Sequence, residues 1–305
     1  MLYMGNVNRI IFWVVIPLIL FSYLAFRLTE WRTIGDEGRS LIAKKHSLNL
    51  KANNNFNCLI LGGSNSMFSL SAEQMSSHSD LHCYNISLVK EGFSDTAYFQ
   101  FIQNLPIDKS NIKYVFYSSI FPLNKSFFEM RLAHNQRGMS LSGDLSFKLV
   151  GSMSIASYLK DWLSNNREFF SSRNQYPLPN TYGDFNFDEY GNCNIKDIHN
   201  NWGVIPDNDA LITWTRSQLA QITSLFPNAQ IYLVLPPLLQ SYVSNKDLNN
   251  LSDTLSKITS ENSIYFIKQA PFLNTSILCD EIHHANSIGR KIRTQDLLSA
   301  YELNL

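Results

Sequence analysis

The stretch Leu59–Phe68 reads LILGGSNSMF and sets the first strand and the turn after it. A short run of branched apolar residues that ends in glycine is typical of a buried strand. Gly62 and Gly63 let the backbone turn sharply at the carboxyl end of that strand, so that Ser64 is presented at the edge of a sheet. A helix cap or a phosphate-binding turn has the same pattern, but the sequence lacks the GxxxxGK[ST] of a P-loop and the third glycine of a dinucleotide loop.

Further apolar runs have the same character, because they are short, rich in Val, Ile, Phe and Tyr, and bounded by breakers. They are His82–Leu88, Lys113–Ser118, Gln230–Leu235 and Ser263–Lys268. Helix-like stretches lie between several of them, at Asp95–Leu105, Asp209–Leu225 and Lys246–Thr259. Strands that alternate with helices predict an α/β fold with a mostly parallel sheet and helices on both faces. In such sheets the ligand lies beyond the carboxyl ends of the strands.

The region from Phe121 to Pro206 breaks this alternation, and we interpret it as an insertion beside the site. It contains a candidate helix near Ser154–Leu163 and a turn-rich stretch from Asn174 to Asn194. An irregular segment of this length is uncommon unless it is functional or mobile. Its aromatic side chains either stack on a sugar or pack the insertion onto the domain. They are Tyr176, Tyr182, Phe185, Phe187 and Tyr190.

The segment Ile10–Phe26 has no charged residue and is bounded by Arg9 and Arg27. It has the length of about 17–25 residues that spans a bilayer. A cleaved signal peptide and a buried core helix are the alternatives, but no small-x-small cleavage site follows. The sequence therefore predicts an anchor over residues 1–28, a juxtamembrane linker over 29–56 with a helix at Arg39–Lys45, and a domain over 57–305 with the insertion at about 121–206.

The charge balance excludes one class of partner. The 25 basic and 25 acidic residues give a net charge of zero, whereas nucleic-acid binding calls for a basic face. The cysteines form no CxxC pair and no metal-binding spacing, so we expect no metal and no cofactor. Cys58 and Cys83 lie in or beside apolar runs, where buried thiols are usual, and Cys279 is interpreted as packing; the sequence chooses no disulfide pair.

A second motif, CDEIHHANSIGR, runs from Cys279 to Arg290 ahead of a predicted C-terminal helix. Asp280 precedes His283 by three residues, a spacing at which a carboxylate can orient an imidazole to act as a general base on a serine. Glu281 and His284 have the same spacing and are the alternative pair. As a metal pair, Asp280 and His283 would need further ligands, and the sequence offers no obvious ones.

Together the two motifs resemble the SGNH (GDSL-like) hydrolase superfamily over roughly Asn57 to Leu298, apart from the insertion. Gly62-Gly63-Ser64 stands where the family has G-D-S, with Gly63 in place of the aspartate. The run from Asp280 to His283, with Asn286, Gly289 and Arg290 after it, is similar to the family's extended D-x-x-H motif. The resemblance implies Ser64, rather than Ser66, as nucleophile, His283 as base and Asp280 as the orienting acid.

The resemblance also implies an oxyanion hole. The family uses the nucleophile's N–H and a glycine after the second strand, which correspond here to Ser64 and Gly92. The family's third donor, an asparagine in G-x-N-D, is missing: the sequence after the third strand offers Ser118, Ser119 or Asn124, of which Ser119 is our prediction. Losing such a donor costs a hydrolase about 3–4 kcal/mol.

Anchored proteins with such a domain resemble acyltransferases and esterases that modify bacterial envelope polysaccharides. The resemblance predicts a serine enzyme that transfers or removes O-acyl groups, by default O-acetyl, on a cell-surface polysaccharide. Its partners would be the lipid bilayer of the bacterial inner membrane, a polysaccharide or small acyl-ester substrate, and a membrane protein that donates the acyl group. The alternatives are a catalytically weakened module that binds glycan or scaffolds envelope assembly, and a lipid esterase held at the membrane.

Two predictions conflict on which side of the membrane the domain faces. The resemblance favours an extracytoplasmic domain, and that is the orientation we expect. However, only Arg9 and the terminal amine precede the predicted span, and the basic residues after it are Arg27, Arg32, Arg39, Lys44 and Lys45. The positive-inside rule taken literally therefore favours a cytoplasmic domain.

Overall fold

The computed structural model describes residues 55–78, 80–88, 95–105, 107–118, 179–185, 208–241, 244–259, 263–272, 274–279 and 283–302, together with Trp13, Pro17 and Lys44. The strands are β1 (Cys58–Gly62), β2 (Cys83–Asn85), β3 (Tyr114–Ser118), β4 (Gln230–Val234) and β5 (Ile264–Ile267). The α-helices are α4 (Ser64–Ser69), α5 (Ala72–Met75), α6 (Asp95–Gln103), α11 (Asn208–Leu225), α12 (Asn245–Thr259) and α13 (Ser287–Glu302), with 3-10 turns η2 (Lys109–Asn111) and η5 (Thr275–Ile277).

The five strands form one sheet in the order β2-β1-β3-β4-β5, and every pair in it is parallel. Each predicted strand is present, with bounds that differ by a few residues at most. Parallel strands buried on both faces read as continuous apolar runs, and all residues of β1 are indeed buried. The predicted α/β class with a parallel sheet is therefore confirmed.

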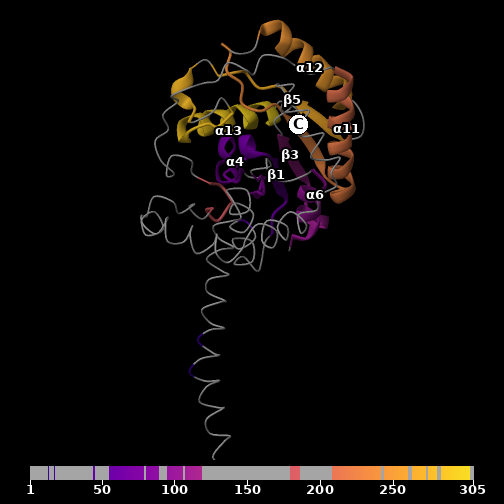
Figure 1. The fold of residues 1–305 in the computed structure, drawn as a ribbon, viewed down its shortest axis with the longest axis vertical. Coiled ribbons are helices and arrows are strands. Elements are labelled where there is room, and N and C mark those ends of the chain that lie inside the picture. The colour runs from indigo at the N-terminus through magenta and orange to yellow at the C-terminus, as the bar shows by residue number, and fades with distance from the viewer. Residues whose placement is uncertain are drawn as a thin grey trace, which may run out of the picture.

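Alternate residues of each strand enter two separate cores, because successive side chains point to opposite faces of the sheet. Leu59 and Leu61 of β1 pack with apolar residues of α6, α11 and α12. Cys58 and Ile60 of the same strand pack with residues of α5 and α13. Figure 1 shows α13 and α4 on one side of the sheet and α6, α11 and α12 on the other. Helices on both faces, as predicted, leave the carboxyl ends of the strands as the place for a site.

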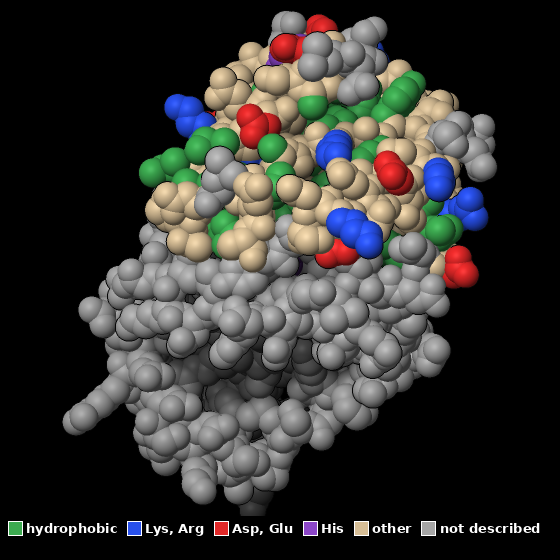
Figure 2. Space-filling view, turned by 90° about the horizontal axis from the view of Figure 1, so that it is seen from above, with side chains coloured by type: hydrophobic (Ala, Val, Ile, Leu, Met, Phe, Trp, Pro, Cys, Tyr) green, Lys and Arg blue, Asp and Glu red, His purple; other side chains and the backbone are tan. Residues whose placement is uncertain are grey.

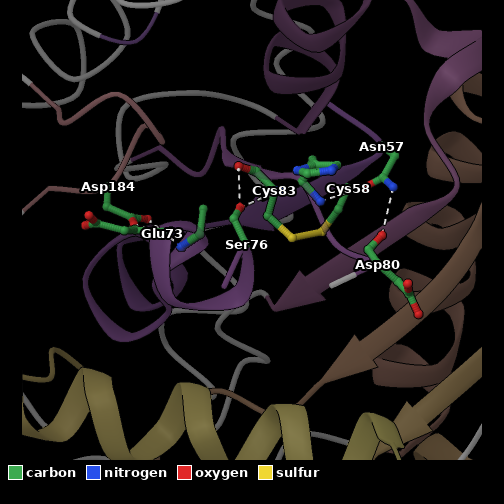
Figure 3. Close-up of a disulfide and its surroundings, with 9 residues drawn as sticks. Asn57, Cys58, Glu73, Ser76, Asp80, Cys83 and Asp184 are labelled. Atoms are coloured by element: carbon green, nitrogen blue, oxygen red, sulfur yellow. Dashed lines mark hydrogen bonds between the residues drawn. A yellow bond between two sulfur atoms is a disulfide. The ribbon is translucent and has the colours of Figure 1, made fainter. Parts of the chain in front are cut away.

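A disulfide joins the first two strands, which corrects the prediction of buried free thiols. Cys58 and Cys83 are directly opposite in the β1–β2 register, and their Cα atoms are 4.3 Å apart (Figure 3). Cys279 is also disulfide-bonded rather than a packing thiol. The sequence could not choose the pair, because register decides which cysteines face each other and apolar strand patterns do not specify it.

We expect this bond to stabilise the fold by reducing the conformational entropy of the unfolded chain. A bond that closes a loop of 25 residues contributes about 3.5 kcal/mol in the chain-entropy account. Cys58→Ala, Cys83→Ala and the double variant should each lose a similar amount in urea unfolding, because either single change already breaks the bond. Losses that add in the double variant would show that packing of the two side chains, and not the bond, supplies the stability.

Residues 179–185, the part of the insertion that is described, pack against the edge strand β2. The Tyr182 carbonyl accepts a hydrogen bond from the Asn85 N–H at 2.8 Å. The Asp184 carboxylate accepts from the backbone N–H groups of Ala72 and Glu73 at 2.9 and 3.0 Å, beside the start of α5 (Figure 3). A carboxylate is favourable at a helix N-terminus. This segment thus pairs with part of the edge strand β2.

Two of the aromatic side chains considered for sugar stacking are packing residues. Phe185 is fully buried, and Tyr182 packs on the core beneath α5 and α13. Tyr176, Phe187 and Tyr190 lie outside the described residues. The Phe185 ring faces the ammonium of Lys44, which lies 5.0 Å from the ring centroid and donates to the Asn85 and Gly183 carbonyls. Lys44 belongs to the segment predicted as a linker, yet its side chain is fully buried in the domain.

The predicted anchor lies outside the described residues except for Trp13 and Pro17, which are exposed. Within the described part of the chain, no helix has the length and apolar character needed to cross a bilayer. On the face seen in Figure 2, the Lys and Arg side chains of the described residues are interspersed with Asp and Glu.

Candidate active site

The candidate nucleophile lies where the chain order of the sheet reverses. From β1 the chain proceeds outward to β2 and then returns to β3 on the other side. Gly62 at the end of β1 pairs with Ser118 at the end of β3. Ligands of open parallel sheets bind beyond the strand ends at such a switch point. Ser64, the first residue of α4, follows β1 at this point.

The turn from β1 into α4 requires glycine at position 62. Gly62 has a φ of +149°, and a Cβ added there would collide with the Ser118 carbonyl and the Ser66 hydroxyl. The Gly63 carbonyl accepts the first helical hydrogen bonds of α4, from the N–H groups of Ser66 and Met67, both at 3.1 Å. A Cβ at position 63 would lie 3.0 Å from Asn65 Oδ1. The chain therefore has a glycine, where G-D-S has aspartate, at a place crowded by its own Asn65.

The two serines of the turn have different environments. The Ser66 hydroxyl donates to the Ser118 carbonyl, so its proton is already used to join α4 to β3. Asn65 strengthens the same junction by donating to the Ser118 hydroxyl at 3.1 Å and to the Ser118 carbonyl at 3.3 Å. These bonds make Ser66 and Asn65 parts of the scaffold. They favour Ser64, which begins the helix, as the reactive hydroxyl.

Tyr98 of α6 supports the turn from the other face of the sheet. Its hydroxyl accepts a hydrogen bond from the Gly62 N–H at 2.9 Å, and its side chain is fully buried. Burial also raises the pKa of the Tyr98 phenol, so it stays neutral. Nearby, Asp95 accepts from the Trp214 indole N–H at 3.0 Å, which joins α6 to α11. The turn beneath Ser64 is thus held from the face of the sheet that α6 and α11 cover.

Tyr98→Phe is expected to lower the free energy of unfolding by about 1–3 kcal/mol, because it leaves the buried Gly62 N–H without its acceptor. Urea unfolding measures the loss. Tyr232→Phe is the matched control, since the Tyr232 hydroxyl bonds a side chain, that of Gln230, at 2.8 Å. Equal losses in the two variants would contradict a special role for Tyr98.

His283 lies fully buried at the same edge of the sheet. Its Nδ1 is 2.7 Å from the carbonyl oxygen of Pro237, just past the end of β4. Because a carbonyl can only accept, Nδ1 must carry the proton. In the neutral ring the other nitrogen, Nε2, is then the basic one. The Pro237 carbonyl therefore selects the tautomer that a general base needs.

The electrostatics of His283 keep it neutral near pH 7. Burial lowers the pKa of the imidazole to about 4, a change that the Pro237 hydrogen bond opposes and that His284 and Arg293 reinforce. Arg293 of α13 is itself buried and donates to the Leu235 carbonyl. A neutral imidazole can accept a proton from a hydroxyl without first losing one.

The remaining residues of the second motif shape the loop around His283. Asn286 caps α13, accepting from the Gly289 N–H at 3.0 Å, and its amide donates to the Ser276 carbonyl at 2.7 Å. A Cβ at Gly289 would collide with the Ile277 carbonyl, so α13 packs on η5 only with glycine there. Arg290 donates to the Phe185 carbonyl and thereby binds the insertion.

Three of the predicted site residues, Asp280, Gly92 and Ser119, lie outside the described residues, so their roles remain predictions. The described alternatives have structural roles. The His284 ring packs edge-on against Phe68, with centroids 5.0 Å apart. Ser118 accepts hydrogen bonds from the Asn65 side chain. In the described part of the chain, no cluster of His, Cys, Asp or Glu could hold a metal.

No family model and no curated protein matches the chain. A proposed platelet activating factor from Streptococcus pneumonia has a similar structure, with a TM-score of 0.46 and 12% identity over 91% of this chain and 98% of that one. A family two carbohydrate esterase from Clostridium thermocellum has a TM-score of 0.40 and 10% identity over 81% of this chain and 63% of that one. An acetyl xylan esterase from Butyrivibrio proteoclasticus has a TM-score of 0.34 and 12% identity, again over 81% and 63%. These likenesses are too distant to assign an activity, which rests on the residues of the site.

Proposed function

We propose that the protein is a serine acyl-ester enzyme in which Ser64 is the nucleophile and His283 the general base. One observation supports this most directly: a neutral imidazole, with its proton held on Nδ1 by Pro237, lies at the sheet edge where Ser64 begins α4. Nucleophile and base on elements that meet at one edge are the arrangement that acyl transfer needs. Asp280 is proposed to stabilise the charged form of His283.

The reaction proceeds in two halves. His283 Nε2 takes the proton of the Ser64 hydroxyl as its oxygen attacks the ester carbonyl, and the N–H groups of Ser64 and Gly92, with Ser119, receive the oxyanion. His283 then gives the proton to the departing alkoxide, which leaves an acylated Ser64. Water, or a sugar hydroxyl, repeats the steps in reverse and releases the acyl group. Water makes the protein an esterase, and a sugar hydroxyl makes it a transferase.

We further propose that the domain is extracytoplasmic, anchored by Ile10–Phe26, and acts on O-acyl groups of a surface polysaccharide. The Cys58–Cys83 disulfide and the disulfide-bonded Cys279 support the location, because such bonds persist in oxidising compartments. This evidence opposes the literal positive-inside reading of Arg27, Arg32 and Arg39. A polysaccharide at the outer surface of the membrane is then within reach of the site.

The second candidate, a weakened module that binds glycan, is favoured by two features of the sequence: the glycine at position 63 where G-D-S has aspartate, and the missing asparagine of G-x-N-D. A fluorophosphonate probe separates the two. The full chain, purified in detergent so that Lys44 stays in place, is treated with the probe, and the modified peptide is identified by mass spectrometry. Modification of Ser64 supports the enzyme. A folded protein that the probe leaves unmodified would reject the enzyme in favour of the binding module.

A further inference from the structure

The helix that begins with Ser64 ends at a side chain that binds the backbone of His283. Ser69, the last residue of α4, donates its hydroxyl hydrogen to the His283 carbonyl at 3.0 Å. The same hydroxyl oxygen accepts the Ala285 N–H at 3.4 Å. Ser69 is fully buried. One hydroxyl thus bonds the backbone on both sides of His284, from the helix that carries the nucleophile.

A hydroxyl used as both donor and acceptor has little freedom to rotate, so it fixes the loop in position and in orientation. The side chains next to it add contact, because Phe68 packs edge-on against His284. His283 is then held from two directions: its backbone by Ser69 and its ring by the Pro237 carbonyl. Together these contacts define where Nε2 points.

We propose that Ser69 is a positioning residue that sets the imidazole of His283 against the hydroxyl of Ser64. The inference rests on the proposed function, because it concerns the same pair. α4 is a single short helix with Ser64 at one end and Ser69 at the other. Any movement of the His283 loop relative to Ser69 is therefore a movement relative to the nucleophile. An error of about 1 Å in such a pair can cost on the order of 100-fold in rate.

The competing explanation is that Ser69 only stabilises the fold by satisfying buried backbone groups. Ser252 provides a matched control for that explanation. It is also buried, and its hydroxyl donates to a backbone carbonyl, that of Leu248, at 2.7 Å. Ser252 lies on α12, which covers the opposite face of the sheet from α13. Removing this hydroxyl tests the loss of a buried hydrogen bond without touching Ser64 or His283.

The experiment compares the full-length parent with Ser69→Ala, Ser69→Thr and Ser252→Ala. It measures kcat and KM for a short acetyl ester and the second-order rate of Ser64 modification by a fluorophosphonate. Ser69→Ala is expected to lower kcat and the modification rate by about 10- to 100-fold, with KM within about twofold of the parent. Ser69→Thr keeps the hydroxyl and should recover most of the loss. Ser252→Ala should react like the parent.

A folded Ser69→Ala protein that reacts at the parent rate would overturn the proposal, as would equal losses in Ser69→Ala and Ser252→Ala. If Ser69→Ala does not fold, Ser69→Cys replaces it, since a thiol is similar in size but a weaker hydrogen-bonding group. An intermediate rate then supports the proposal, and a parent rate overturns it. A parent protein in which Ser64 is not modified would reject the proposed function itself, and Ser69 as a positioning residue with it.

Discussion

Replacing Ser64 by alanine is expected to lower kcat/KM for a short acetyl ester by about four orders of magnitude or more. Without its nucleophile, a serine enzyme keeps only the contribution of binding and the oxyanion hole. The measurement uses a chromogenic acetyl ester and the full chain in detergent. The fold should be unaffected, because other side chains hold the turn. Ser66 and Asn65 bond Ser118, and Tyr98 bonds the Gly62 N–H.

Ser66→Ala is the informative companion variant. Its hydroxyl donates to the Ser118 carbonyl, so the change should cost stability by about 1–3 kcal/mol. Activity should stay within about tenfold of the parent, because Ser66 belongs to the scaffold of the turn and is not the nucleophile. A factor of ten corresponds to about 1.4 kcal/mol in the barrier. The reverse outcome, with Ser66→Ala inactive and Ser64→Ala active, would make Ser66 the nucleophile and refute the assignment.

The architecture followed from local patterns that the structure preserves. The run at Lys113–Ser118 became β3, Tyr114–Ser118, and the stretch at Lys246–Thr259 became α12, Asn245–Thr259. Such segments are predictable because a strand buried on both faces needs a continuous apolar run, whereas a helix on its surface needs an apolar stripe. β2 was predicted less well, because only Cys83–Asn85 of the run at His82–Leu88 pairs as a strand.

The contacts that assemble the site were not predictable in the same way. The Pro237 partner of His283 is a backbone carbonyl, which has no signature in the side-chain pattern. The adjacent prolines Pro236 and Pro237 predict the end of a strand and the rim of a pocket, but not a hydrogen bond to His283. Ser69 and Tyr98 resemble any polar residue near the end of a helix until the fold brings them to His283 and Gly62. Glycine at position 62 was the exception, since the sharp turn that it permits was readable from the sequence.

Lys44 shows a different limit of prediction from the sequence. A lysine in a charged stretch that follows an apolar segment is ordinarily a solvated linker residue, and buried lysines are rare. Here its ammonium donates to the Asn85 and Gly183 carbonyls, and its burial lowers the pKa of the side chain to about 7. The partners come from β2 and from the insertion, so only the tertiary fold shows why the lysine is buried. An expression variant that begins after Lys44 would remove this contact.

The pH dependence of activity is expected to follow the lowered pKa of the buried His283 imidazole. A general base works in its unprotonated form, and the pKa of His283 is lowered to about 4, against about 6.5 for an ordinary histidine. The kcat/KM for an acetyl ester should therefore stay nearly constant from pH 8 down to about 5 and fall through about 4. His283→Gln should lower kcat/KM by about four orders of magnitude across the whole range.

The pH dependence of the free energy of unfolding provides an independent check on His283. The unfolded chain binds a proton to His283 at about pH 6.5, whereas the folded protein does so only at about 4. The neutral form is thus favoured by folding, so stability is complete above pH 6.5 and is lost as the pH falls toward 4, by about 3 kcal/mol. His283→Gln should lack this part of the acid loss in urea unfolding. If the parent and the variant lose stability in parallel, and the activity of the parent falls near pH 6.5, then His283 is solvated in the working enzyme, and the buried tautomer held by Pro237 is not the form that acts on Ser64.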